Sequence, residues 1–157
     1  MISDPKEKAV LGRLQRQCAR MEYCRSDVFR KAVKALEGDT AAAGRIVDSL
    51  VEDRFVDDLR YASAFAREKA SLQGWGTVKI AFLLRGKGIP DEIIREALAG
   101  IDAEKASLRL EKVVMDKYRT LKGDSQVRLK LLKFVLGRGY SYEEAAPVVE
   151  RVLKGEV

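Results

Sequence analysis

A short motif that occurs twice constrains the fold of this chain more than any other feature of its sequence. Residues 82–90 are FLLRGKGIP and residues 134–141 are FVLGRGYS. Both contain two apolar residues, one variable residue, a Gly–basic–Gly triplet and a further apolar residue, at an offset of 51 positions. An internal repeat of about 50 residues predicts tandem copies of one structural unit rather than a single bundle.

Apolar residues recur at helical spacing through almost the whole chain. Ala145, Val148, Val149 and Val152, for example, follow the spacing i, i+3, i+4, i+7 and so lie on one face of a helix. No segment alternates convincingly between apolar and polar residues, as a half-buried strand would. The predicted helices cover residues 5–23, 26–37, 40–53, 57–73, 77–86, 90–99, 103–121, 125–138 and 141–154. Thr77 can act as the N-cap of the fifth of these, over Val78–Arg85.

These nine helices fall into three groups, each of one long and two shorter helices. Ile80 and Leu83 of the second group match Leu131 and Phe134 of the third, whereas the first group matches only weakly. A three-helix unit of this size cannot bury a sufficient core alone, so neighbouring units must stack. We therefore predict an all-α fold of tandem three-helix repeats, stacked into an elongated, curved array. The predicted units are residues 1–55, which form a divergent first repeat, residues 56–101 and residues 102–157.

The glycines of the repeated motif suit either a phosphate-binding loop or the end of a helix. A P-loop needs the pattern G-x-x-x-x-G-K-[ST] between a strand and a helix. Here Ala81 stands at the first glycine position, Gly88 replaces the Ser or Thr, and no strand precedes the motif. We therefore predict a helix corner in which Gly86 or Gly88 adopts the left-handed conformation.

The composition leaves little material for catalysis or metal binding. The chain has no histidine, which removes the usual zinc ligand and general base. Cys18 and Cys24 would lie about 9 Å apart along one helix, too far for a disulfide, so we expect them to be small buried hydrophobes. Asp57 and Asp58 suggest a metal pair less strongly than they suggest the cap of a helix that begins there. We predict a protein that is not an enzyme and has no metal and no cofactor.

Positive charge is concentrated in two blocks of the chain. The net charge is +6 overall, made up of 0 for residues 1–59, +5 for residues 60–88, −4 for residues 89–104, +7 for residues 105–138 and −2 for residues 139–157. Such alternation gathers positive charge on one side of a fold and suits a polyanion or an acidic protein surface. Ordinary solvated helix faces would give the same counts, so charge alone does not decide between the two.

The sequence predicts a cytoplasmic protein without membrane contact. No apolar stretch approaches the roughly 18–20 residues of a membrane span. The first ten residues, MISDPKEKAV, lack the apolar core of a signal peptide. We also expect the protein to be a monomer.

Residues 55–98 contain a series of spaced motifs: D-x-R-[YF]-A, then F, a basic residue, a G-x-G link, I-x-x-x-L, K-G-I and I-x-x-A-L. The residues that form them are Asp58, Arg60, Tyr61, Ala62, Phe65, Arg67, Gly74, Gly76, Ile80, Leu84, Lys87, Gly88, Ile89, Ile94, Ala97 and Leu98. This series resembles the signature of the RecX family, regulators of the bacterial RecA recombinase. The resemblance is specific over these 44 residues and looser elsewhere, and Thr77 replaces a proline that is usual in the family.

The resemblance implies a non-enzymatic modulator, most simply an inhibitor, of RecA filaments on DNA. Family members lie along the filament groove and inhibit strand exchange, ATP turnover and co-protease activity, which places them in recombination, DNA repair and SOS regulation. The implied partners are the RecA filament and, weakly and without sequence preference, single- and double-stranded DNA. Capping of filament ends and coating of the groove both fit. The alternative is a helix-turn-helix-like DNA-binding regulator that acts without RecA, but such a protein should have one recognition helix and usually dimerises.

Basic residues of the second and third repeats are the candidate partner-binding residues, with solvated surface charge as the competing explanation. Lys and Arg contact phosphates and acidic surfaces, and Arg can do so with two parallel hydrogen bonds. Trp75, which lies between two glycines, suits stacking on a base or filling a partner pocket. An anchor in the protein's own core is the more favoured role for it. The candidates are Arg60, Arg67, Lys69, Lys79, Arg85, Lys87, Lys130, Lys133, Arg138 and Trp75.

Overall fold

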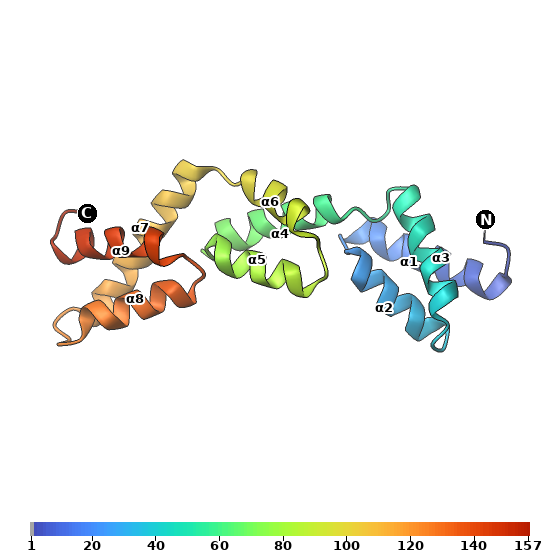
Figure 1. The fold of residues 1–157 in the computed structure, drawn as a ribbon, viewed down its shortest axis with the longest axis horizontal. Coiled ribbons are helices and arrows are strands. Elements are labelled where there is room, and N and C mark those ends of the chain that lie inside the picture. Colours follow the sequence, from blue (N-terminus) through green and yellow to red (C-terminus); the bar gives the residue numbers. More distant parts are fainter. Residues whose placement is uncertain (1) are drawn as a thin grey trace.

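The computed structural model describes residues 2–157, and this part of the chain forms nine α-helices and no β-strand. Figure 1 shows the helices in three successive groups of three, arranged in an elongated row from the N-terminus to the C-terminus. The predicted all-α helical repeat fold is confirmed. The helices are α1 Pro5–Arg20, α2 Arg25–Ala35, α3 Thr40–Glu52, α4 Asp58–Ser71, α5 Thr77–Gly86, α6 Asp91–Ala99, α7 Ala103–Leu121, α8 Val127–Gly137 and α9 Tyr142–Leu153.

Each group of helices buries its own apolar residues, so the molecule has three small cores instead of one. Ile46 lies in the first core, Ile80 in the second and Leu131 in the third, and all three are fully buried. Cys24 is also fully buried, but it packs into the second core although it precedes α2 of the first group. Cys24 and the partly buried Cys18 are both free thiols, as expected.

Side-chain and backbone caps explain where the helices of the second group begin. Asp57 accepts a hydrogen bond from the Arg60 backbone N–H and so caps α4, which is the role predicted for it. Thr77 was expected to cap the next helix, but Gly76 is the N-cap of α5 and Thr77 is the first helical residue. The prediction was wrong by one residue because the N–H of Gly76 is bonded to another repeat, which holds the chain there without a side-chain cap.

Both copies of the glycine motif form corners at the C-terminal ends of second helices, α5 and α8. Gly88 has φ 75° and Gly139 has φ 98°, the left-handed conformation predicted for such a corner. The second helices α8, α5 and α2 follow one another along the row in Figure 1. The corner of each later repeat meets the start of the second helix in the repeat before it.

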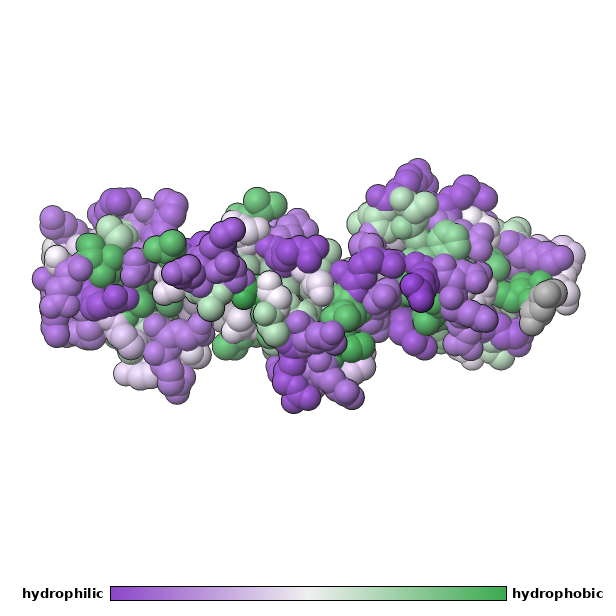
Figure 2. Space-filling model, turned by 90° about the horizontal axis from the view of Figure 1, so that it is seen from above, coloured by the Kyte–Doolittle hydropathy of each residue, from purple (hydrophilic) through white to green (hydrophobic). Residues whose placement is uncertain are grey.

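The surface is mostly polar. The face drawn in Figure 2 is largely hydrophilic, with small separate apolar patches. The second helices nevertheless carry some exposed apolar side chains, such as Phe82 on α5, which is 72% exposed. No helix in the described part of the chain combines the length and hydrophobicity needed to cross a membrane.

Candidate functional site

The contact between the second and third repeats, called joint 2–3 below, is made by backbone atoms. The Gly76 N–H donates a 2.8 Å hydrogen bond to the Arg138 carbonyl, and the Val78 N–H donates a 2.9 Å hydrogen bond to the Gly139 carbonyl. These N–H groups belong to the N-cap and the first turn of α5, and they have no acceptor within that helix. The carbonyls after α8 therefore cap α5, and the two helix dipoles are aligned head to tail.

Joint 2–3 requires glycine on both sides. A Cβ atom on Gly76 would lie 2.4 Å from the Gly139 carbonyl oxygen. A Cβ atom on Gly139 would lie 2.3 Å from the Cβ of Lys79. The hydroxyl of Tyr140 closes the contact by donating a 3.0 Å hydrogen bond to the Gly74 carbonyl. The two repeats are thus held at a fixed separation that larger residues would prevent.

Ammonium groups and aromatic rings alternate on the second-repeat side of this joint. The Lys79 Nζ lies 4.1 Å from the centre of the Trp75 ring, and the Lys69 Nζ lies 5.0 Å from it. The Lys69 Nζ also lies 5.5 Å from the centre of the Phe65 ring. These distances are within the range of cation–π attraction, worth about 0.5–1 kcal/mol each at exposed sites.

The third repeat continues the same pattern across the joint. The Lys117 Nζ lies 4.7 Å from the centre of the Phe134 ring, and the Arg138 guanidinium lies 5.7 Å from it. Arg138 also donates a hydrogen bond to the Gln73 carbonyl of the second repeat. We call the full set the cation–aromatic stripe. It consists of Phe65, Lys69, Trp75, Lys79, Lys117, Phe134 and Arg138.

The lysines of the stripe are chemically suited to bind anions. Lys69, Lys79 and Lys117 form no ion pair with any carboxylate in residues 2–157. An ammonium that lies over a ring keeps donors free for a phosphate or an external carboxylate. Trp75 itself is partly buried and packs against the second core, which agrees with the anchor role favoured from the sequence.

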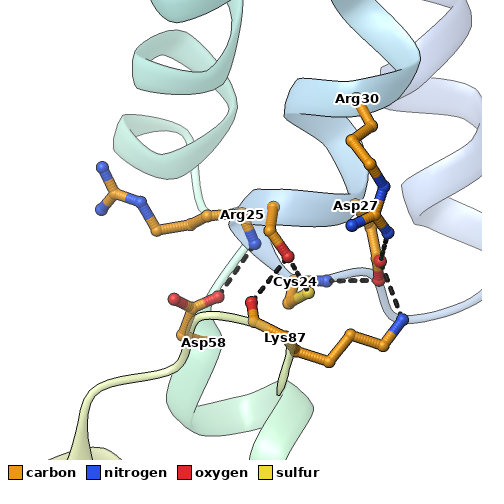
Figure 3. A network of polar contacts seen from close by, with 7 residues as sticks. Cys24, Arg25, Asp27, Arg30, Asp58 and Lys87 are labelled. Carbon is orange, nitrogen blue, oxygen red and sulfur yellow. Dashed lines mark hydrogen bonds and ion pairs between the residues drawn. The ribbon is translucent and has the colours of Figure 1, made fainter. Parts of the chain in front are cut away.

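The contact between the first and second repeats, called joint 1–2 below, depends on side chains instead (Figure 3). The Ser26 hydroxyl donates a 2.6 Å hydrogen bond to the Lys87 carbonyl. The Lys87 ammonium donates a 2.9 Å hydrogen bond to the Asp27 carboxylate. The Arg25 backbone N–H donates a 2.9 Å hydrogen bond to Asp58 of α4. The basic residue of the α5 corner therefore connects two repeats.

Asp27 is the charged residue that the described part of the chain buries most, with 10% of its side chain exposed. Burial tends to raise its pKa, but hydrogen bonds from the Lys87 ammonium and from Cys24 outweigh burial, so the pKa lies below its ordinary value. The same hydrogen bond raises the pKa of Lys87. Both groups therefore stay charged at neutral pH. Lys87 was expected to face a partner molecule, but its ammonium is paired with Asp27 and its side chain is only 35% exposed.

The remaining candidate residues do not gather at one place. Arg67 and Lys133 are exposed and form no ion pair within residues 2–157. Three others are paired at the surface, where such pairs contribute about 0–1 kcal/mol. They are Arg60 with Glu22 (2.7 Å), Arg85 with Asp91 (2.9 Å) and Lys130 with Asp124 (2.7 Å).

Lys117 and Phe134 were missed as site residues from the sequence. Phe134 looked like part of the repeated apolar frame, and the only sign of Lys117 was its place in the block of net charge +7.

An open cleft of about 930 Å³ also lies between the first two repeats, lined by Phe29, Val47 and Ile93 among others. Residues 2–157 contain no group of acidic or cysteine side chains that could hold a metal ion.

Comparison with known proteins identifies the family. A family model described as RecX, second three-helix domain, matches residues 57–98. Regulatory protein RecX of Mycobacterium sp. (strain JLS) is 36% identical over 124 residues, which are 75% of this chain and 68% of that protein. The chain belongs to the RecX family. Regulatory protein RecX of Clostridium botulinum (strain Alaska E43 / Type E3) is 33% identical, over 75% of this chain and 57% of that protein.

Solved structures of the RecX family share the fold. The crystal structure of RecX from Lactobacillus salivarius matches with a TM-score of 0.83 and 18% identity, over 95% of this chain and 97% of that one. A second RecX crystal structure matches with a TM-score of 0.80 and 20% identity, over 92% of this chain and 72% of that one. At such low identity the likeness supports the row of three-helix repeats and nothing about individual side chains.

Proposed function

We propose that this protein is a non-enzymatic regulator of RecA filaments on DNA, and that it inhibits them by lying along the filament groove in the cytoplasm. The proposal rests on membership of a family whose members are named as regulatory proteins. The observation that carries it is the cation–aromatic stripe, which spans joint 2–3 and presents ammonium groups that form no ion pair within residues 2–157. An extended row of repeats offers a long surface for such contacts.

The stripe suits a surface that carries regularly spaced negative charge. Each exposed charge contact contributes about 1 kcal/mol or less, so one contact gives little affinity, whereas several along a rigid row add up. Binding to free DNA should be weak and independent of sequence, and it should fall steeply as salt rises because counterion release drives it. Tight, salt-insensitive binding to one duplex sequence would instead favour the regulator that acts without RecA.

The test is a titration of the protein into RecA that is hydrolysing ATP on single-stranded DNA. A triple variant, Lys69→Glu, Lys79→Glu and Lys117→Glu, should lose inhibition because three attractions become repulsions. Its DNA affinity should also depend less on salt, since each lost phosphate contact lowers the slope of log K against log salt by about 0.7–0.9. Because Trp75 is the single tryptophan and lies under two of these lysines, its fluorescence should report binding directly.

The matched control reverses three exposed cations on α1 of the first repeat, Lys8, Arg13 and Arg16. This variant changes the net charge by the same amount but leaves the stripe intact, so it should inhibit nearly as well as the wild type. Lys87 is excluded from the test because its reversal would place a second carboxylate beside Asp27. If the folded stripe variant and the control inhibit equally, the stripe is not the contact surface.

A further inference from the structure

The open cleft of about 930 Å³ between the first two repeats leaves apolar side chains without full cover. We call it the 1–2 cleft. Both repeats line it, with Phe29 of α2 and Val51 of α3 from the first repeat and Ile93 of α6 from the second. Phe29 is 37% exposed, and Val51 and Ile93 are partly exposed. The cleft therefore presents an apolar surface that neither of the two neighbouring cores absorbs.

A glycine that the fold does not require lies on this cleft. Gly44 is in the interior of α3, where glycine weakens a helix relative to alanine. A Cβ atom at Gly44 would meet no atom within 4 Å, so no neighbour in the described part of the chain excludes alanine there. The absence of a side chain is explained if the backbone of a bound partner comes close to α3 at this point.

An arginine in a strained conformation lies on the same cleft. Arg54 directly follows Asp53, the C-cap of α3, and has φ 61°, which is the left-handed conformation. Glycine is the usual residue there, and the third repeat has one, since Gly155 follows the C-cap of α9 with φ 72°. Strain of this kind, kept where glycine would relieve it, points to a role for the arginine side chain.

The two arginines of the cleft are free, whereas most of its carboxylates are in use. Neither Arg25 nor Arg54 forms an ion pair within residues 2–157. Figure 3 shows the Arg25 side chain pointing out of the polar network of joint 1–2. Asp57 caps α4 and Asp58 accepts the Arg25 backbone N–H, which leaves Asp48 as the remaining aspartate of the cleft. A partner with carboxylates beside an apolar face would pair both arginines.

We propose that the 1–2 cleft binds an amphipathic α-helix of a partner protein, with its apolar face on the cleft and a carboxylate near Arg25 and Arg54. The exposed apolar side chains, Gly44 and Arg54 are each unfavourable for the chain alone, and all of them meet at this one place. Such departures from local preference gather at binding sites. The cleft is separate from the cation–aromatic stripe, so the inference goes beyond the proposed function and does not depend on it.

A helix fits this cleft better than an extended segment does. The walls are helices, so they offer no strand edge, and an extended peptide would leave its N–H and C=O groups unpaired against apolar side chains. A helix pairs these groups internally. The α3 wall consists of Gly44, Val47, Asp48 and Val51, whose spacing i, i+3, i+4, i+7 extends over about 10 Å, or about two turns. The partner helix should therefore present apolar residues at i, i+4 and i+7.

Selection from a library of helical peptides tests this occupant before the partner is known. Peptides are selected on the wild-type chain and counter-selected on Gly44→Leu, whose added side chain occupies the cleft. Enriched peptides should carry apolar residues at i, i+4 and i+7, with Asp or Glu beside them. Because such an interface is smaller than the about 1,200–2,000 Å² that stable complexes bury, we expect dissociation constants of about 1–100 μM. Gly137→Leu on α8, where the added Cβ also meets no atom within 4 Å, is the matched control and should bind these peptides like the wild type.

A second pair of variants tests the role of the strained arginine. Arg54→Gly relieves the strain and removes a cation, so it should raise the urea concentration at half-unfolding. It should also weaken an enriched peptide by about fivefold, the equivalent of one exposed charge contact. Glu37→Gly is the matched control, because Glu37 also has a positive φ, of 56°, and lies outside the cleft. It should raise stability in the same way and leave peptide binding unchanged.

Amide NMR of the full chain places an enriched peptide, whose signal shifts should fall on residues 44–51 and 90–93 and not on joint 2–3. The proposal fails if no peptide distinguishes the wild type from Gly44→Leu, if the enriched peptides are basic beside their apolar residues, or if Arg54→Gly binds them as tightly as the wild type. Single-stranded DNA, followed by Trp75 fluorescence, should bind Gly44→Leu and the wild type alike. Failure of the cleft and failure of the proposed function are therefore distinguishable.

Discussion

Replacing Gly76 by alanine should separate the second and third repeats without harming either core. Gly76 has φ −82°, which alanine adopts freely, so backbone strain does not enter. The added Cβ would lie 2.4 Å from the carbonyl oxygen of Gly139 and 2.5 Å from its carbonyl carbon. Neither atom belongs to a flexible side chain, so the two backbones must move apart.

The size of the effect follows from the contacts that this movement breaks. Two backbone hydrogen bonds are lost, Gly76 to Arg138 and Val78 to Gly139, each worth about 1 kcal/mol net. Insertion of one methyl group into a filled site typically costs about 1–3 kcal/mol. The overlap is relieved as the joint opens, so the two effects do not add fully. We expect the free energy that holds the third repeat against the second to fall by about 2–3 kcal/mol.

Urea denaturation followed by Trp75 fluorescence and by circular dichroism measures this loss. Trp75 directly precedes Gly76 and reports on the joint, whereas dichroism reports on all helices. The control is Gly86→Ala on the same helix, where no atom lies within 4 Å of the added Cβ. Alanine there should be neutral or stabilise by up to about 1 kcal/mol. If both variants unfold at the same urea concentration, joint 2–3 does not hold the repeats together as described.

Two further outcomes are expected. Lys87→Met should destabilise the first repeat in urea by about 1–3 kcal/mol, because it removes a charge-assisted hydrogen bond from the buried Asp27, which then keeps Arg30 and the Cys24 N–H as partners. Arg85→Met, which removes a surface pair, should cost under about 1 kcal/mol; equal losses would contradict the difference. The pKa of Asp27 is lowered in the folded state, so its contribution to the free energy of unfolding is complete above pH about 4 and is lost as pH falls through the lowered value. In Asp27→Asn the free energy of unfolding should therefore fall less steeply between pH about 4 and the lowered pKa.

The helices and their grouping were predictable because the signals for them are local. Apolar residues at helical spacing and the corner glycines act within one repeat, and neither needs knowledge of distant contacts. The N-cap of α5 was predicted one residue late for the opposite reason. Thr77 has a side chain that suits a cap, but the N–H of Gly76 is bonded to a carbonyl 62 positions away in the chain, Arg138.

The candidate site was predicted only in part because charge counts do not show which cations are already paired. Lys69 and Lys79 were chosen for their charge, and the structure places them over Trp75. Lys87 was chosen on the same grounds, yet it is bonded to Asp27, sixty positions earlier in the chain. Nothing near Asp27 in the sequence marks it as the partner of a lysine, since an aspartate three residues after an N-cap normally serves only that cap.

The two joints explain why a motif that occurs twice does not produce the same contact twice. Lys87 and Arg138 stand at the same place in their corners, but Lys87 meets a buried carboxylate and Arg138 meets a backbone carbonyl. What differs is the residue opposite each corner. At Gly76 the two backbones are hydrogen-bonded to each other, whereas at Cys24 the contact is made through the side chains of Ser26 and Asp27. The repeated motif therefore determines the shape of the corner, and the start of the preceding second helix determines how tightly two repeats are joined.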